Sequence, residues 1–146
     1  MDAFFKELKR FILPALTLVT FIAGSLSSAA IDSWYFSLNK APFNPPGYIF
    51  GIVWPILYLL MAIVSYRNHV LIFKPFVVQL FLNGIWSWLF FAWHMPLVAL
   101  ADIVVLIVIN IFIFRELRGI DKLMQLPYLL WLGFATYLNA GIVILN

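Results

Sequence analysis

Charged residues divide this chain into long apolar segments. A helix needs about 20 predominantly apolar residues to cross the roughly 30 Å hydrocarbon core of a bilayer. Four stretches without Asp, Glu, Lys or Arg reach or exceed that length, and a fifth is interrupted only by Asp102. The pattern predicts a single domain over residues 1–146 with a capping loop at 31–46 and five transmembrane helices, at about 11–30, 47–66, 75–93, 97–115 and 123–144.

Composition supports a membrane protein and argues against a water-soluble enzyme or a nucleic-acid partner. Of the 146 residues, 65% are hydrophobic and 10% are charged, with a mean hydropathy of +1.04. Soluble domains are nearer 45–50% apolar and about 25% charged. Only helices and closed barrels satisfy the backbone in lipid, and these apolar runs lack the alternation of barrel strands. The expected fold is an all-α integral membrane bundle.

Basic residues predict the orientation of this bundle. Cytoplasmic flanks of helical membrane proteins are enriched in Lys and Arg. Lys40 lies in the first loop, whereas the other eight basic residues fall in segments that five spans place on one side: Lys6, Lys9, Arg10, Arg67, Lys74, Arg115, Arg118 and Lys122. We therefore expect the N-terminus inside and the C-terminus outside. This asymmetry suits a bacterial plasma membrane.

The start of the chain has a second interpretation. Its basic residues, apolar run and Ser28-Ala29-Ala30 imitate a secretory signal peptide with a cleavage site. The apolar run is longer than a usual signal-peptide core, and its removal would leave four spans. We favour a retained first helix.

The first loop, residues 31–46, combines aromatic residues with Pro42, Pro45 and Pro46. Proline fixes its own φ and restricts the residue before it, so the loop is expected to be ordered and non-helical. Trp and Tyr favour the membrane interface, which gives one explanation of the composition. A lid over a binding site is the other.

Polar and aromatic residues recur at helical spacing within three spans. Polar side chains in a span usually face the bundle interior. The stripes are Phe50, Trp54 and Tyr58; Gln79, Asn83, Trp86 and Phe90; and Tyr128, Trp131, Ala135 and Asn139. For any single residue, packing against a neighbouring helix is the more common role. Three such stripes beneath one loop indicate an apolar cavity with a few polar groups, the usual form of a small-molecule site.

Other chemistry-bearing residues do not form a familiar catalytic pattern. Asp102 is the only acid well within a span; we favour a structural role over a proton or cation site. His69 and His94 fall in loops on opposite sides, so they are not expected to share a metal. The sequence has no HExxH motif, catalytic triad or Gly-rich phosphate loop, and no cysteine.

In their order and spacing, several motifs resemble those of the TspO/MBR family, which includes bacterial tryptophan-rich sensory proteins and the mitochondrial translocator protein. The similarity covers nearly the whole chain. Its motifs are Trp34-Tyr35, Leu38, Lys40, Pro42, Pro45-Pro46, Val53-Trp54, Gln79-Leu80, Leu82-Asn83, Trp86, Phe90-Phe91, Asp102, Pro127-Tyr128-Leu129, Trp131, Phe134-Ala135-Thr136 and Leu138-Asn139.

This resemblance implies a five-helix bundle, commonly a homodimer, that binds porphyrins and benzodiazepine-type ligands beneath the first loop. No cofactor is required; a porphyrin would be ligand or substrate. In bacterial members, tryptophans matching Trp54 and Trp131 have been linked to light-dependent porphyrin breakdown. The resemblance and the three stripes of polar and aromatic residues together predict which residues bind a ligand. They are Trp34, Tyr35, Phe50, Trp54, Tyr58, Asn83, Trp86, Phe90, Trp131, Ala135 and Leu138.

The implied function is a membrane receptor or sensor of protoporphyrin and heme-like tetrapyrroles. The alternative is a transporter that moves tetrapyrroles or lipids through the same cavity. A third hypothesis is a purely structural membrane subunit. Family members also occupy outer membranes, which leaves that location open beside the plasma membrane. The chain departs from many members at Gly84, where they carry an aromatic residue, so we expect either a larger pocket or a looser helix contact.

Overall fold

The computed structural model describes residues 2–146, which fold into helices without a strand. Five helices are long and apolar enough to cross a membrane, as predicted. The first comprises α1 (Asp2–Lys9) and α2 (Ile12–Ser27), and the others are α4 (Gly47–Arg67), α5 (His69–Ser87), α6 (Pro96–Glu116) and α7 (Ile120–Leu145). A 3-10 turn, η1 (Ser28–Ala30), extends α2, and a π-helical turn, η2 (Trp88–Ala92), extends α5.

Several helices are longer than their predicted spans. The third begins at His69 instead of residue 75, and the fifth begins at Ile120 instead of residue 123. The prediction stopped at Lys74 and Lys122 because charges end an apolar run. A charge marks the edge of the hydrocarbon, however, and a helix continues through the interface into water.

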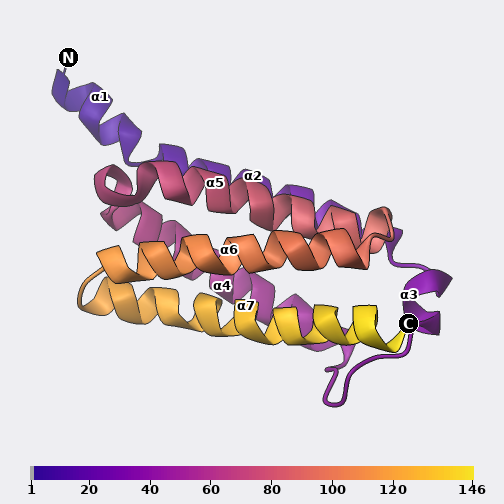
Figure 1. Ribbon diagram of the computed structural model, residues 1–146. Coiled ribbons are helices and arrows are strands. Elements are labelled where there is room, and N and C mark those ends of the chain that lie inside the picture. The colour runs from indigo at the N-terminus through magenta and orange to yellow at the C-terminus, as the bar shows by residue number, and fades with distance from the viewer. Residues whose placement is uncertain (1) are drawn as a thin grey trace.

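The five long helices surround a common centre. α2 contacts α4 and α5, α6 packs between α5 and α7, and α7 closes the ring against α4. Figure 1 shows the long helices running roughly alongside one another, with α1 bent away from them at one end. The core of this ring is apolar and fully buried, with Met61, Phe76, Leu106 and Leu132 at 2% exposure or less.

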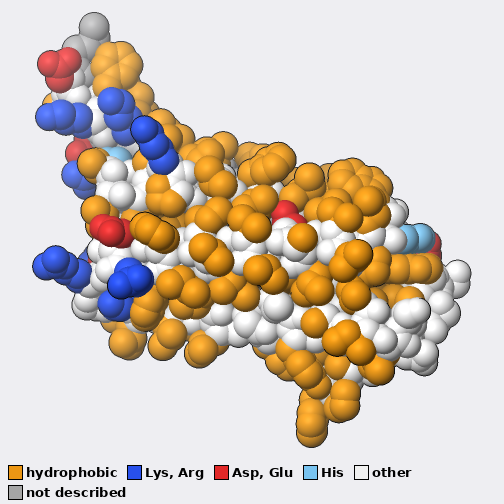
Figure 2. All heavy atoms as spheres, viewed as in Figure 1, with side chains coloured by type: hydrophobic (Ala, Val, Ile, Leu, Met, Phe, Trp, Pro, Cys, Tyr) orange, Lys and Arg blue, Asp and Glu red, His pale blue; other side chains and the backbone are white. Residues whose placement is uncertain are grey.

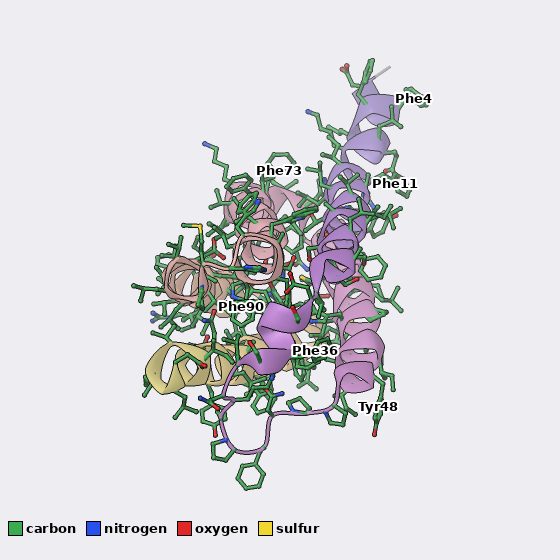
Figure 3. All side chains as sticks on the ribbon, turned by 90° about the vertical axis from the view of Figure 1, so that its right-hand side faces the viewer. Phe4, Phe11, Phe36, Tyr48, Phe73 and Phe90 are labelled. Carbon is green, nitrogen blue, oxygen red and sulfur yellow. The ribbon has the colours of Figure 1, made fainter. Side chains whose placement is uncertain are left out.

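The first loop contains a helix that the sequence analysis did not predict. α3 (Ser33–Ser37) is one and a half turns long, and the Asp32 side chain caps it by accepting the backbone N–H of Trp34 at 3.1 Å. The expectation of a non-helical loop was wrong here because its three prolines begin only at Pro42. Figure 3, viewed from this end, shows α3 lying in front of the ends of the long helices.

The second half of the first loop is fastened to α7. The backbone N–H of Asn39 donates to Asn146 Oδ1 at 3.0 Å, and Asn146 Nδ2 donates to the Asn39 carbonyl at 2.8 Å. The Tyr137 hydroxyl donates to the carbonyl of Pro42 at 2.8 Å. These contacts, more than 90 residues apart in sequence, hold the loop in one position over the bundle.

Charge and apolar surface are separated along the bundle. In Figure 2 the Lys and Arg side chains of the visible face gather at the end where α1 projects, and apolar side chains cover the flank. The two ends of the chain lie at opposite ends of the bundle (Figure 1), as an odd number of spans requires. Which end faces the cytoplasm stays a prediction.

Candidate ligand-binding cavity

A cavity of about 600 Å³ lies among α2, α4, α5 and α7, beneath α3 and the first loop. This volume is within the range of about 300–1,000 Å³ that small-molecule sites occupy. Ten of its lining residues are aromatic: Phe21, Tyr35, Phe36, Phe50, Trp54, Tyr58, Trp86, Phe90, Phe91 and Trp131. Such a lining favours a large, flat, apolar ligand.

The structure brings together ten of the eleven residues expected to bind a ligand. They are Tyr35, Phe50, Trp54, Tyr58, Asn83, Trp86, Phe90, Trp131, Ala135 and Leu138, all of which line the cavity. The exception is Trp34, which lies outside the lining. Its ring stacks on that of His94 at a centroid distance of 4.2 Å and packs against Phe90. Trp34 thus fixes α3 to the bundle instead of facing the cavity.

One wall is a pair of indoles from α4 and α7. The rings of Trp54 and Trp131 meet edge to face, with centroids 6.2 Å apart and planes at 87°. Phe50, one turn before Trp54 on α4, packs against Trp131 with ring centroids 5.6 Å apart and ring planes at 71°. Edge-to-face contacts are a preferred arrangement of aromatic rings, so the wall is ordered without a ligand. The indole N–H of Trp131 is buried and has no acceptor within residues 2–146.

The opposite wall is centred on Trp86 of α5. Its indole N–H donates to Asn139 Oδ1 at 3.0 Å, and Asn139 Nδ2 donates to the Pro96 carbonyl at 2.9 Å. Phe90 stacks on Trp86 with planes 23° apart. Asn139 of α7 thereby orients an indole of α5 and ties both helices to the start of α6.

Below the cavity, a chain of polar side chains links α4, α5 and α7. The Tyr58 hydroxyl donates to Asn83 Oδ1, Asn83 Nδ2 donates to the Tyr128 hydroxyl at 2.7 Å, and that hydroxyl donates to Gln79 Oε1 at 2.8 Å. Asn110 of α6 joins the chain by donating to Gln79 Oε1 at 3.4 Å. Gln79 and Tyr128, members of the predicted stripes, are fully buried and lie outside the cavity lining.

Asn83 is one of the residues expected to bind a ligand. Both polar atoms of its amide already have partners in the protein, Tyr58 and Tyr128. Its amide is therefore primarily part of the floor, where it sets the position of the Tyr58 hydroxyl. The helical spacing correctly predicted that Asn83 lines the cavity. A hydrogen bond from the second N–H of its amide to a ligand stays a prediction.

Lys40 is the one charged residue that lines the cavity within the part of the chain described here. Its ammonium donates to the carbonyls of Tyr35 and Leu38, at 3.0 and 3.2 Å, and lies 4.7 Å from the centre of the Tyr35 ring. These contacts shape α3 and the loop behind it. They also place a positive charge at the loop end of an otherwise uncharged cavity.

The sequence analysis missed the wall formed by α2 and η1. Five residues of this segment line the cavity: Phe21, Gly24, Ser25, Ser27 and Ser28. The three serine hydroxyls donate to carbonyls of their own helix, three or four residues earlier. The five residues recur at three- or four-residue spacing, which would have predicted one face, but four of them are small and stand out little from the rest of the span.

Asp102, His69 and His94 play no part in the cavity lining. Asp102 is half-buried on α6, and its Oδ2 atom has no hydrogen-bond partner in residues 2–146. Over the same residues, no group of three His, Cys, Asp or Glu side chains is arranged to hold a metal ion. A proton or cation role for Asp102 stays untested.

Comparison with known proteins agrees with this architecture. The model of the TspO/MBR family matches residues 11–145. "Tryptophan-rich protein TspO" of Chlorobaculum tepidum is 37% identical over 90% of this chain and 91% of its own length. The protein of the same name from Archaeoglobus fulgidus is 34% identical, covering 90% and 92%. "Tryptophan-rich sensory protein" of Cereibacter sphaeroides is 32% identical, covering 79% and 78%. The chain is a multi-pass membrane protein that belongs to the TspO/MBR family.

Proposed function

We propose that this protein is a membrane receptor or sensor that binds porphyrins in the cavity beneath the first loop. The observation that carries the proposal is an aromatic cavity of about 600 Å³ with a single cation at its loop end. Membership of a family that contains tryptophan-rich sensory proteins supports it.

The cavity's chemistry matches the two parts of a protoporphyrin. The macrocycle is flat and largely apolar, and it would lie between the Trp54–Trp131 wall and the Trp86–Phe90 wall. Each aromatic contact of this kind contributes about 0.5–1.5 kcal/mol beyond the burial of apolar area. The propionates are anionic, and Lys40 offers them a cation. Benzodiazepine-type ligands are apolar and aromatic, so the same walls suit them without the Lys40 contact.

Protoporphyrin titration in the dark, followed by tryptophan fluorescence, tests the proposal. We expect saturable quenching by the detergent-solubilised protein, weakened by Trp131→Phe because that wall loses area. Trp93→Phe is the matched control, since Trp93 is half exposed and lies outside the cavity. Linear quenching that neither variant changes would indicate partitioning into the micelle and would contradict the proposal.

The Lys40 contact has its own test. Lys40→Ala should weaken binding of protoporphyrin more than binding of its dimethyl ester, which has no carboxylate for the ammonium to pair with. An effect on both ligands of equal size would remove the propionate contact. That result would mean that Lys40 acts by holding the conformation of the loop, through its hydrogen bonds to the carbonyls of Tyr35 and Leu38.

We further propose that bound porphyrin undergoes light-dependent degradation with Trp54 or Trp131 as electron donor. Electron transfer to the excited macrocycle would leave a tryptophan radical cation and a porphyrin radical anion, and dissolved dioxygen would be the oxidant that then breaks the ring. Both indoles line the cavity, so either is near enough to a bound ring to take part. Protein-dependent bleaching of the porphyrin absorbance should fall in the double variant Trp54→Phe/Trp131→Phe at matched occupancy. Unchanged bleaching would remove this mechanism and leave binding intact.

A further inference from the structure

The first helix breaks at Arg10 and Phe11, and Pro14 explains the break. Proline has no N–H, and its ring collides with the carbonyl four residues earlier, here that of Arg10. The backbone N–H groups of Arg10 and Phe11 instead bond to carbonyls three residues back, those of Glu7 and Leu8. α1 therefore ends at Lys9 and, as Figure 1 shows, leaves the bundle at an angle to α2.

No residue of α1 is buried in the protein. Phe4, Leu8 and Phe11 follow the spacing i, i+4, i+7, which places them on one face of a helix. They are 63%, 46% and 55% exposed, and Phe5 beside them is 52% exposed. Phe11, which follows α1, packs against Tyr66, whereas the apolar side chains of α1 itself are largely uncovered by other parts of the described chain.

The opposite face of α1 is charged. Asp2, Lys6 and Lys9 follow the same spacing, and Arg10 comes directly after them. In Figure 2 the basic side chains of this segment continue into those at the adjoining end of the bundle. That end carries eight of the nine basic residues of the chain and only four of its six acids. An amphipathic helix is therefore attached to a positively charged end of a membrane bundle.

We propose that α1 lies in the membrane interface, with its apolar face inserted between lipids and its basic face on anionic phospholipid headgroups. A short helix with an apolar and a basic face is typical of interfacial binding. α2 and η1 run without a gap from Ile12 to Ala30, close to the length of about 20 residues that crosses the hydrocarbon, so α1 can begin at the membrane surface. The break at Pro14 allows α1 to turn from the bundle axis toward the membrane plane.

A second copy of the chain is a poorer occupant of this face. Stable protein interfaces use about 20–30 residues on each side, whereas α1 is eight residues long. Pairing two copies through it would also bring the basic side chains of both together. Lipid covers the same apolar side chains without these costs.

The absence of cysteine allows a direct test with single-cysteine variants of the full chain. An environment-sensitive fluorophore is attached at Leu8→Cys on the apolar face or at Lys6→Cys on the charged face. The proteins are reconstituted in vesicles of phosphatidylcholine, with or without phosphatidylglycerol. Lipids carrying a quencher on the acyl chain, and iodide in the buffer, then report on which side each label lies.

We expect the lipid quencher to act on the label at residue 8 and iodide to act on the label at residue 6. Phosphatidylglycerol should increase the contrast, because each Lys or Arg near an anionic surface strengthens binding about five-fold. The variant Lys6→Gln/Lys9→Gln/Arg10→Gln should lose this dependence on phosphatidylglycerol, and added salt should weaken it. Circular dichroism of each variant verifies that the five-helix bundle is retained.

Two results would overturn the proposal. Equal iodide quenching at residues 6 and 8 in both kinds of vesicle would place α1 in water. Protection of residue 8 that ignores lipid composition but rises with protein density would show that a second copy covers it. Neither outcome depends on porphyrin binding, so this inference and the proposed function can fail separately.

Discussion

The indole of Trp34 stacks on the imidazole of His94, with ring planes 13° apart and centroids at 4.2 Å. His94 adopts a positive φ of 53°, and its Nε2 atom lies 3.5 Å from Asp32 Oδ2. Asp32 in turn caps α3. The connection between η2 and α6 therefore holds one end of α3, while α7 holds the loop beyond it.

His94→Asn should loosen α3. Asn tolerates a positive φ, so the substitution removes the stacked ring with little added backbone strain. The lost aromatic contact is worth about 0.5–1.5 kcal/mol. We expect faster hydrogen exchange in residues 33–37 and unchanged exchange in the centre of α6. Equal protection in both proteins would show that the contacts with α7 suffice to hold the first loop.

A second fastening of the loop is a close contact between Ala41 and Gly141. A Cβ added at Gly141 would lie 2.6 Å from the Ala41 Cβ, and 3.5 Å from its Cα. Gly141→Ala should therefore displace the loop at a cost of about 1–3 kcal/mol, as other overpacked sites do. Thermal unfolding in detergent measures this cost, and ligand titration shows whether the cavity changes with it.

The double variant Ala41→Gly/Gly141→Ala provides the control. It removes the clashing Cβ and leaves the 3.5 Å contact with Cα, which is an ordinary separation. The thermal stability of the double variant should therefore be close to that of the unmodified protein. The difference from the sum of the two single effects measures the coupling between residues 41 and 141. Additive losses would mean that the loop does not rest on Gly141 in solution.

The buried Tyr128 hydroxyl is expected to matter for stability. It accepts from Asn83 and donates to Gln79, and its side chain is 0% exposed. Tyr128→Phe removes one hydrogen bond from Asn83 and one from Gln79. An unsatisfied buried polar group costs about 1–3 kcal/mol of stability. Tyr48→Phe is the matched control, since Tyr48 is 68% exposed and its hydroxyl makes no hydrogen bond within residues 2–146. Thermal unfolding in detergent measures the effect. An equal shift of the unfolding midpoint in Tyr128→Phe and Tyr48→Phe would contradict a stabilising role for the hydrogen bonds of Tyr128.

The sequence predicted the helices and most of the cavity for one physical reason. In a membrane, charges mark the ends of helices, and polar or aromatic residues within a span mark the inward face. This identified the contributions of α4, α5 and α7 through Trp54, Trp86 and Trp131. The periodicity did not separate cavity from core along a stripe, so Tyr128 and Gln79 were grouped with residues that line the cavity.

The remaining errors involve contacts between distant segments. The side on which Trp34 lies depends on His94, 60 residues later, and no local pattern encodes that pairing. α3 begins where Asp32 caps it, whereas the expectation of a non-helical loop rested on the prolines that follow. The α2 wall uses glycine and serine, whose small side chains reveal a face only once the neighbouring helix is known.

Gly84 illustrates the same dependence on a neighbour. It lies outside the cavity lining, and a Cβ there would be 3.3 Å from Thr20 Cγ2, so the residue permits close contact between α5 and α2. Neither a larger pocket nor a looser contact, the two expectations for this position, describes its environment. An aromatic residue here would have to displace α2.

Gly84→Ala should be nearly neutral in thermal unfolding. Helix propensity favours alanine by about 1 kcal/mol, and the tight contact with the Thr20 methyl group opposes that gain. In a Thr20→Ser background, which lacks the methyl group, the same substitution should become stabilising. Gly84→Phe should destabilise by about 1–3 kcal/mol in either background because its ring overpacks the contact between the helices. If the serine background makes no difference to Gly84→Ala, the two helices are not in contact at this point.

The orientation of the bundle is the last prediction. Eight basic residues lie in segments at one end, and Lys40 lies at the other. By the positive-inside rule the end carrying α1 faces the cytoplasm, and the cavity with its loop opens on the opposite side. A reporter fused after Asn146 should therefore be active only on the outer side, and one fused before α1 only on the inner side. Removing charge tests the cause: neutralising Arg115, Arg118 and Lys122 should produce a fraction of inverted molecules, whereas Lys40→Gln should not. A cytoplasmic reporter at Asn146 would reverse the assignment and place the cavity's loop, with Lys40, on the cytoplasmic side.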